Sequence, residues 1–376
     1  MKSTVEKLTT VQDSLNQQFL EREDVIEGLI LALMTGQHAL LVGPPGTAKS
    51  QMIKALTASI SGANYFELLL SKFSKPEEVF GPISLKALEQ DEYRRITTGK
   101  LPEAKIAFLD EVFKASTAIL NSLLTIINER IYHNNGTPMQ CPLITLIGAS
   151  NELPEGDEEA ALAAFADRFL FRYQVGYLAE DASFASMLSL PEVRAEAPQL
   201  DLADINAAQT LVKQVSFGQD AVEALVALRT ALGKEGILVS DRRWRQSVSA
   251  LQAKAVLAGS DRVVVDRDFD VLVHILWTDF GNKNKVTKIV RRVTNPLAER
   301  VQEILEEARE IYQNAIGSGK ADEGSEAIAK FKVMQQQLTS IESLLAPGAK
   351  TKAQKAREKM GVWHKEVLEK CLGITI

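Results

Sequence analysis

The chain has 376 residues, of which 45% are hydrophobic and 24% charged, as expected for a globular protein of two or three domains. Its 43 basic and 49 acidic residues give a formal net charge of −6, which argues against a protein that coats nucleic acid. The two cysteines, Cys141 and Cys371, are too few for a disulfide framework and favour a reducing compartment. The sequence shows no signal-peptide pattern and no apolar run of membrane length, so we expect a cytoplasmic protein without a membrane span.

Two helices are predicted within residues 4–35. Apolar residues recur at spacings of three and four from Val5 to Leu15, which is the period of an amphipathic helix. The second helix is predicted to begin at the acidic run 21–24, because carboxylates stabilise a helix N-terminus. It is predicted to end at Gly36, since glycine readily takes the backbone conformation that terminates a helix.

Short strands that alternate with helices are predicted over the next hundred residues. The expected strands are His38–Val42, Ala104–Leu109 and Leu143–Gly148, and the expected helices are Lys49–Ile60 and Ala118–Ile127. Continuous apolar runs of this length are typical of parallel strands that are buried on both faces. The alternation predicts an α/β fold, with helices on both sides of a mostly parallel sheet.

Only helices are predicted after about residue 180. Residues 200–280 are expected to form an all-helical domain, and three further helices are predicted from Asn295 onward. The sequence thus divides into an α/β core at 1–190, an all-helical domain at 191–294 and a helical tail at 295–376.

Apolar stripes run along the predicted tail helices. Residues from Phe331 to Leu345 and from Ala353 to Val367 repeat at spacings of three and four, the pattern of seams between packed helices. Such seams suit packing inside the chain, as a hairpin folded back on its own domain, or packing against a partner. Because exposed apolar seams need a covering surface, we expect residues 200–280, the next subunit or a partner to cover them. The tail is then a lever or docking element.

A glycine- and proline-rich loop joins the first predicted strand to the helix that follows. Its residues are Gly43, Pro44, Pro45, Gly46, Thr47, Ala48, Lys49 and Ser50. They match the phosphate-binding pattern G-x-x-x-x-G-K-[ST] except at Ala48, where the pattern has glycine. In such a loop, backbone N–H groups surround the phosphates, Lys49 reaches the β- and γ-phosphates, and Ser50 ligates Mg²⁺. The loop therefore predicts a site for ATP or ADP with Mg²⁺.

Two carboxylates, Asp110 and Glu111, end the apolar strand that precedes them. In an open α/β sheet, reactive groups gather beyond the carboxyl ends of the strands. Asp110 is expected to hold Mg²⁺ together with Ser50, and Glu111 to act as the base that orients an attacking water. Asp-Glu pairs are common at strand ends, but one that follows a phosphate loop favours the catalytic interpretation.

Three further polar residues are candidates for contacts with the γ-phosphate. Asn151 follows the third strand and could hydrogen-bond the water or the phosphate, or form a turn. Arg168 could stabilise the charge that develops on the transferred group, or pair with Asp167 at the surface. An arginine at the start of a predicted helix, Arg242 or Arg243, could reach the phosphates from the helical domain.

Six spaced motifs resemble those of the MoxR family of AAA+ ATPases, and within it the RavA-type branch. They are Gly43–Ser50, Phe73–Pro82, Phe108–Glu111, Asn121–Arg130, Ala149–Pro154 and Ser240–Trp244. The resemblance covers roughly residues 1–280. It implies a P-loop AAA+ αβα sandwich followed by an all-helical lid domain. The tail departs from it, because RavA-type proteins carry a small β-rich domain where this sequence predicts only helices.

The resemblance also implies roles for individual residues. Lys49 and Ser50 match Walker A, Asp110 and Glu111 match Walker B, and Asn151 matches sensor 1. Arg168 matches the arginine finger that is given to a neighbouring subunit. Arg242 matches sensor 2 better than Arg243 does, and Arg22 lies where the linker approaches the adenine. Residues 80–98 match an insertion that faces the pore of a hexamer.

The resemblance implies a Mg²⁺-dependent ATPase that assembles as a homo-oligomer, a hexameric ring or spiral. Such enzymes remodel or activate a partner, typically a protein with a von Willebrand factor A domain. The alternative is a nucleic-acid motor or clamp loader, which should show basic residues interleaved with aromatic ones. A basic run occurs from Lys350 to Lys359, but its helical spacing and acidic flanks indicate a solvated helix face. A third hypothesis is a purely structural nucleotide binder. The presence of Glu111 and Arg168 argues against it, because binding alone requires neither residue.

Overall fold

A computed structural model describes residues 2–153, 160–189, 200–277, 279–343 and 347–374. The chain divides into two compact units, one formed by residues 1–222 and 237–283, the other by residues 223–236 and 284–376. Within the described residues, no helix is long and apolar enough to cross a membrane. The domain boundaries at 190 and 294 stay a proposal from the sequence.

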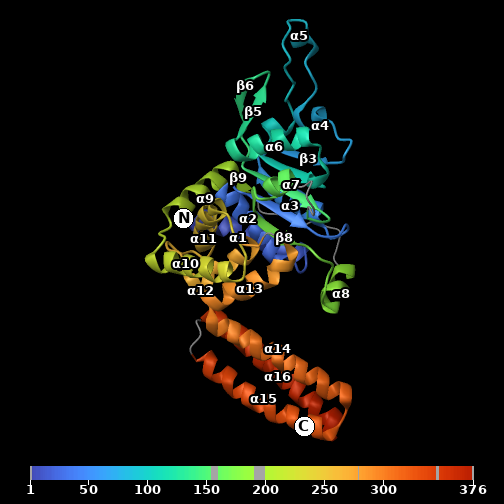
Figure 1. Ribbon diagram of the computed structural model, residues 1–376, viewed down its shortest axis with the longest axis vertical. Helices are drawn as coiled ribbons and strands as arrows, with labels where there is room; N and C mark the ends of the chain where they lie inside the picture. The colour runs from blue at the N-terminus through green and yellow to red at the C-terminus, as the bar shows by residue number, and fades with distance from the viewer. Residues whose placement is uncertain (1, 154–159, 190–199, 278, 344–346, 375–376) are drawn as a thin grey trace. The chain divides into compact units, whose positions relative to one another are not determined.

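A five-stranded parallel sheet forms the centre of the first unit (Figure 1). Its strand order is β3-β4-β7-β1-β8. The strands are β1 (His38–Val42), β3 (Tyr65–Leu69), β4 (Ile106–Asp110), β7 (Thr145–Ser150) and β8 (Phe169–Gln174). Because β1 lies between β7 and β8 and all strands run the same way, the carboxyl ends of β4, β7 and β1 meet at one edge of the sheet.

Burial explains why these segments form strands. Every residue of β1 and β7 is buried, as is β4 up to its final aspartate. Helices cover both faces of the sheet, which makes the core an αβα sandwich and confirms the predicted fold class.

The two outermost strands, β3 and β8, were not predicted from the sequence. In β3 only Phe66 is buried, so this edge strand lacks the continuous apolar run of a central one. In β8 the strand follows directly on Arg168, and its buried Arg172 interrupts the apolar pattern. Two short strand pairs were also not predicted: β2 (Ile60–Ser61) with β9 (Leu200–Asp201), and the hairpin of β5 (Ile131–Asn134) with β6 (Thr137–Gln140).

Four helices that are distant in sequence pack together in the first unit. They are α1 (Lys2–Gln18), α2 (Glu23–Thr35), α9 (Leu202–Gln214) and α11 (Asp241–Leu257). The two amino-terminal helices were predicted, and α2 ends at Gly36 as expected. The predicted all-helical segment therefore packs on the amino-terminal helices through α9 and α11.

The remaining helices of the first unit are short or surround the sheet. They are α3 (Lys49–Ala58), α4 (Pro76–Phe80), α5 (Leu85–Leu88), η1 (Leu101–Glu103), η2 (Val112–Lys114), α6 (Thr117–Glu129), α7 (Ala160–Ala166), α8 (Asp181–Ser189), α12 (Val265–Asp268) and η4 (Phe269–His274). Between α4 and η1 the chain forms a hairpin with α5 near its tip, joined by a bridge between Ile83 and Arg95 (Figure 1). This hairpin occupies the segment that the sequence predicted as an insertion.

The helical tail forms a three-helix bundle in the second unit. Its helices are α14 (Pro296–Ser318), α15 (Ala321–Glu342) and α16 (Pro347–Leu372); α10 (Gln219–Lys234) and α13 (Phe280–Thr294) have residues in both units. The buried residues of the bundle include Ile304, Phe331 and Met360, one from each helix. The predicted stripes pack on one another from Phe331 to Ile341 and from Ala353 to Val367, which confirms packing inside the chain, while Leu345 lies outside the described residues. The three helices bury one another's seams in this core. That the tail acts as a lever or docking element stays a prediction.

Candidate active site

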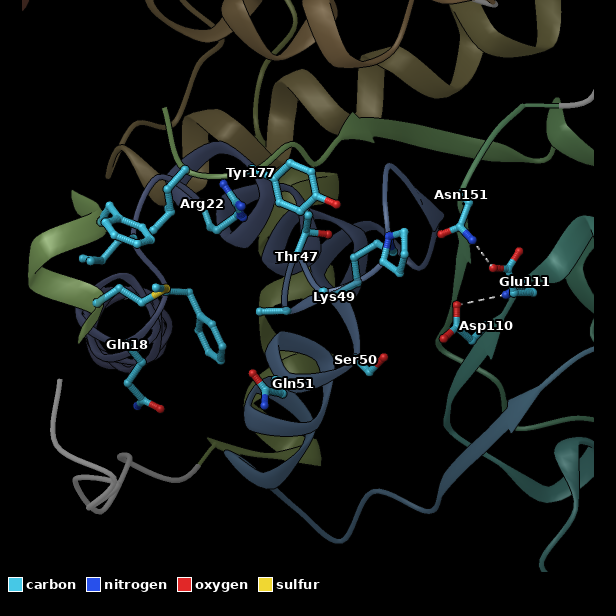
Figure 2. A pocket seen from close by; sticks show the side chains of 18 residues that line it. Gln18, Arg22, Thr47, Lys49, Ser50, Gln51, Asp110, Glu111, Asn151 and Tyr177 are labelled. Atoms are coloured by element: carbon cyan, nitrogen blue, oxygen red, sulfur yellow. Dashed lines mark hydrogen bonds between the residues drawn. The ribbon is translucent and has the colours of Figure 1, made fainter. Parts of the chain in front are cut away.

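A cavity of about 830 Å³ lies beyond the carboxyl ends of β1, β4 and β7 (Figure 2). Its lining joins most of the residues predicted to bind nucleotide. Those residues are Arg22, Pro45, Gly46, Thr47, Ala48, Lys49, Ser50, Asp110, Glu111 and Asn151. The volume falls in the range of small-molecule and cofactor sites.

The phosphate loop has the backbone shape that its chemistry requires. Gly43 cannot carry a side chain, because a Cβ there would lie 2.0 Å from the Val175 backbone oxygen. Ala48 adopts a left-handed conformation with φ 64° and ψ 19°, which costs a non-glycine residue about 1–2 kcal/mol. The single departure from the phosphate-loop pattern thus keeps the glycine-like backbone at a cost in strain.

Lys49 begins α3 and is buried at the phosphate end of the cavity. Its Nζ donates to the backbone oxygens of Gly43 at 2.6 Å and Pro44 at 2.9 Å. Burial lowers the pKa of Lys49, while the carboxylates of Asp110 and Glu111 oppose that shift. An anion in the loop would therefore meet an ammonium group that already lies at this end of the cavity and is partly desolvated.

The carboxylate of Glu111 is held by two neighbours. Asn151 Nδ2 donates to Glu111 Oε1 at 2.5 Å, and Lys114 Nζ lies 3.3 Å from the other carboxylate oxygen (Figure 2). Glu111 itself adopts a left-handed backbone with φ 52°, a strained conformation of the kind that gathers at functional sites. Its own N–H donates to Asp110 Oδ1 at 2.9 Å. The three predicted residues Asp110, Glu111 and Asn151 therefore form one connected group.

Ser50 and Asp110 fit a Mg²⁺ ion that is shared with phosphate oxygens. Both line the phosphate end of the cavity, and Mg²⁺ characteristically takes one or two protein ligands together with phosphate oxygens and waters. Among the described residues, no group of three or more His, Cys, Asp or Glu side chains could hold a metal. A metal at this place thus depends on the nucleotide for the rest of its ligands.

Arg22 lines the opposite end of the cavity, together with Tyr177 (Figure 2). Its guanidinium donates to the backbone oxygens of Gly176 at 2.5 Å and Glu21 at 2.7 Å. Glu21 in turn accepts hydrogen bonds from the N–H groups of Ala179 and Glu180, which lower the pKa of its carboxyl group. Arg22 therefore ties the segment after β8 to the loop between α1 and α2, and its contact with an adenine stays a prediction.

The apolar wall at this end was not predicted from the sequence. It is formed by Phe19, Leu20, Tyr177, Leu178, Phe184 and Met187. Tyr177 is 68% exposed and Phe184 52% exposed, and α8 buries none of its side chains. An apolar wall with exposed aromatic rings suits a purine base. The sequence signal was a short helix whose apolar residues lack a periodic core-facing stripe.

Arg168 and Arg242 lie in a different cavity, of about 670 Å³. Its lining also includes His38, Arg130 and Gln246, and shares no residue with the phosphate cavity. His38 begins β1 and pairs in register with Phe169, the residue after Arg168. The phosphate loop follows the other end of β1, about 13 Å away at the rise of a strand. Hence the structure does not bring Arg168 or Arg242 to the phosphates of their own chain.

The neighbouring residues resolve two alternatives that the sequence left open. Asp167 pairs with Arg243 at 3.1 Å, whereas the Nε atom of Arg168 has no hydrogen-bond partner within the part of the chain that the structure describes. The interpretation of Arg168 as a surface partner of Asp167 is therefore wrong. Arg243 is 1% exposed and fully bonded, while Arg242 is exposed at the cavity. Of the two arginines, only Arg242 is available to a ligand.

Comparisons with known proteins agree with this geometry. Residues 6–214 match the family model of the MoxR domain in the MoxR-vWA-beta-propeller ternary systems, and residues 220–290 match an AAA lid domain. The chain is 40% identical over 302 residues to an uncharacterized protein of Methanocaldococcus jannaschii, covering 80% of this chain and 78% of that protein.

Two more distant similarities extend the comparison. Chaperone MoxR1 of Mycobacterium tuberculosis is 25% identical over 157 residues, 42% of this chain and 41% of that protein. A solved structure from Cytophaga hutchinsonii shares the fold with a TM-score of 0.62 and 16% identity, covering 77% of this chain and 94% of that one. A phosphate loop, a connected carboxylate pair and a matching lid thus go together with a family match over more than half of the sequence: the chain belongs to the MoxR family of AAA+ ATPases.

Proposed function

We propose that this protein hydrolyses ATP to ADP and phosphate with Mg²⁺, and uses the reaction to remodel or activate a partner protein. The observation that carries the proposal is the meeting of Lys49, Asp110, Glu111 and Asn151 in one cavity with an apolar wall at its far end. Phosphoryl transfer needs positioning and charge stabilisation more than covalent chemistry. This cavity supplies both.

Each side chain has a distinct task in that reaction. Backbone N–H groups of residues 43–48 and the α3 N-terminus hold the phosphates, and Lys49 turns its ammonium from the loop carbonyls to the β- and γ-phosphates. Ser50 and Asp110 would hold Mg²⁺, which would supply positive charge to the phosphate oxygens. Glu111 accepts the proton of the attacking water. Asn151 keeps the Glu111 carboxylate directed at that water.

Assembly completes the site. Arg168 and Arg242 lie at the amino end of the sheet, and the phosphate loop lies at the carboxyl end. We therefore place both arginines against the γ-phosphate of a neighbouring subunit, in a hexameric ring or spiral. A ring of identical subunits joined by head-to-tail contacts gives every subunit the same complete site. The hairpin of residues 80–98 then faces the pore.

The partner is proposed to be a von Willebrand factor A domain protein. The support is the description of the matching family model, whose MoxR domains act in systems with vWA and β-propeller components. The RavA-type branch rests on the motifs from Gly43 to Trp244 alone. We place the protein in the cytoplasm, where ATP is abundant and both cysteines stay reduced.

Paired variants test the ATPase assignment. Glu111→Gln should keep nucleotide affinity and lose turnover by about 10²–10⁴-fold, because an amide cannot accept the proton. Lys49→Ala should lose nucleotide affinity instead. Fluorescent-nucleotide titration separates these effects, and turnover of Glu111→Gln near the wild-type rate would refute the assignment of the base.

A nucleic-acid motor is the weaker candidate. The basic run lies on α16, where Ala353, Ala356 and Met360 face the bundle core and Arg357 pairs with Glu342 at 3.1 Å. That arrangement is a solvated helix face rather than a track of basic and aromatic residues. Stimulation of turnover by single-stranded DNA or RNA, with a steep salt dependence, would favour the motor.

A further inference from the structure

We infer that Arg243 and Asp167 are positioning residues that hold Arg168 and Arg242 as one rigid pair. The inference rests on the proposed function, in which these two arginines act on a neighbouring subunit. It assigns a task to a buried ion pair that contacts no nucleotide in its own chain.

The guanidinium of Arg243 is bonded on every side. Its Nη1 donates to the backbone oxygens of Leu170 at 2.9 Å and Ile275 at 2.8 Å. Its Nη2 donates to the backbone oxygens of Asp167 at 3.2 Å and Phe169 at 3.0 Å, and to Asp167 Oδ1 at 3.1 Å. The Nε atom lies 3.3 Å from the same carboxylate oxygen. Such a planar fork fixes the backbone on both sides of Arg168.

The carboxylate of Asp167 joins the same group from the other side. Ser240 Oγ, the cap of α11, donates to Asp167 Oδ2 at 3.4 Å and accepts from the Arg243 N–H at 3.3 Å. Arg172 lies 3.9 Å from Asp167 Oδ1 and donates to the backbone oxygens of Ala166 and Trp277. Asp167 is thus shared by two buried guanidinium groups and carries the negative charge that they need.

This arrangement locks two chain segments that are distant in sequence. Residues 166–170 carry Arg168 between α7 and β8, and residues 240–243 carry Arg242 on the first turn of α11. Arg243 and Asp167 each immediately adjoin one of these arginines and bind each other. We call the bonded group of Asp167 and Arg243 the clamp. Because Asp167 pairs with Arg243 in the clamp, Arg168 does not pair with Asp167 and faces the same cavity as Arg242.

A mispositioned arginine should lower turnover without affecting the cavity that binds nucleotide. Displacement of a catalytic group by about 1 Å can cost about 10²-fold in rate. We therefore expect Arg243→Gln to keep its ATP affinity within about twofold and to lose about 10²-fold in kcat. Arg243→Lys keeps the charge but lacks the fork, and should recover only part of the loss. Arg245→Gln, an exposed position on the same helix, is the matched control and should behave as wild type.

Mixed assemblies test whether Arg243 serves the neighbouring subunit or only stabilises its own chain, because only the first role predicts recovery of activity on mixing. Lys49→Ala has intact arginines but no functional phosphate loop, whereas Arg243→Gln has the reverse. Mixed in equal amounts, they should regain activity at about one interface in four of a ring. Recovery of this kind, from two inactive proteins, supports the clamp as a device that serves the neighbouring subunit.

Three outcomes would overturn the inference. Arg243→Gln that loses ATP affinity as Lys49→Ala does would place Arg243 in its own nucleotide site. Failure of its mixture to recover, while Arg168→Ala mixed with Lys49→Ala does recover, would remove the clamp and leave the trans assignment intact. Failure of the Arg168→Ala mixture would instead refute the trans assignment and with it this inference. If circular dichroism shows that Arg243→Gln does not fold, Asp167→Asn, which keeps the shape and removes the charge, decides in the same assays.

Discussion

The two cavities of the first unit differ in what they lack. The phosphate cavity has a loop for the anion, two carboxylates and an apolar wall, but its cation Lys49 is the only one aimed at the phosphate end among the residues that line it. The arginine cavity has Arg168 and Arg242 without a phosphate loop or an apolar wall. In the proposed function each cavity supplies about half of a phosphoryl-transfer site, and the two cavities lie at opposite ends of β1.

The difference suits a site in which catalysis depends on assembly, as the proposed function requires. In the proposed function a single chain binds nucleotide with its own loop, while Arg168 and Arg242 line a cavity that shares no residue with that site. Binding at the interface would stabilise the assembly by linkage, since the nucleotide binds the assembled form better. The four predictions below separate the cavities by variants that alter one and spare the other, from the largest expected effect to the smallest.

Removing a guanidinium from the arginine cavity should have the largest effect. Arg168→Ala is expected to lower kcat by about 10³-fold or more, because arginine fingers contribute about 10³–10⁵-fold to such reactions. ATP affinity should change little, since Arg168 does not line the phosphate cavity. Titration and steady-state turnover, measured in parallel, check this. If the wild-type protein sediments as a monomer and keeps full activity, the two cavities do not depend on each other across subunits.

Acid should lower the stability of the folded protein through His38, which lines the arginine cavity. Burial and the nearby charge of Arg130 lower the pKa of His38 to about 3. Its Nδ1 accepts the Leu146 N–H at 2.9 Å, so its proton sits on Nε2, which lies 3.1 Å from the Ile127 backbone oxygen. In the unfolded chain the pKa is near 6.5, so the unfolded state binds more protons between pH 6.5 and 3.

Stability should therefore fall as the pH drops through that window, by up to about 1.4 kcal/mol per pH unit from this residue. Urea unfolding at several pH values for wild type, His38→Gln and the exposed control His133→Gln measures the effect. The His38→Gln curve should be flatter than the other two. Identical slopes for all three proteins would show that His38 does not titrate on unfolding.

Backbone strain distinguishes the two cavities as well. Ala48→Gly should stabilise the protein by about 1 kcal/mol, because glycine takes the left-handed conformation without steric cost. Arg130 also has a left-handed backbone, with φ 59°, but its guanidinium donates to the backbone oxygens of Gly36 and Ile127. Arg130→Gly should therefore destabilise. Urea unfolding compares the two variants, and a destabilised Ala48→Gly would contradict the strain argument.

The smallest effect is expected at the apolar end of the phosphate cavity. Glu21→Ala removes the acceptor for the Ala179 and Glu180 N–H groups and should weaken ATP binding several-fold by loosening the segment after β8. Because those bonds lower the pKa of the Glu21 carboxyl group, the tether is complete above its ordinary pKa and is lost as the pH falls through the lowered value.

Nucleotide titration of Glu21→Ala beside Glu23→Ala, an exposed carboxylate on α2, isolates this tether. The Glu23 variant should bind as wild type does. Equal affinity of both variants would mean that the tether does not shape the base end of the cavity.

Much of the phosphate cavity could be predicted because its parts are local. A phosphate loop works through consecutive backbone N–H groups, so the pattern of Gly43–Ser50 can be recognised in the sequence. Asp110 and Glu111 can be placed because they end a predicted strand. The apolar wall escaped prediction, since Tyr177 and Phe184 have no periodic pattern and acquire their role only when the chain after β8 turns toward the α1–α2 loop.

What the sequence alone determined about this protein is its class: the α/β core, the helical segments and the chemistry of each motif. The tertiary structure decided which motifs meet. Arg243 is buried and Arg242 is exposed, although the two are adjacent in sequence, because neighbouring side chains of a helix point to different sides of it. Asp167 forms its ion pair with Arg243 rather than with Arg168, which follows Asp167 in the sequence. Side-chain direction and strand order, which no short motif encodes, set these outcomes.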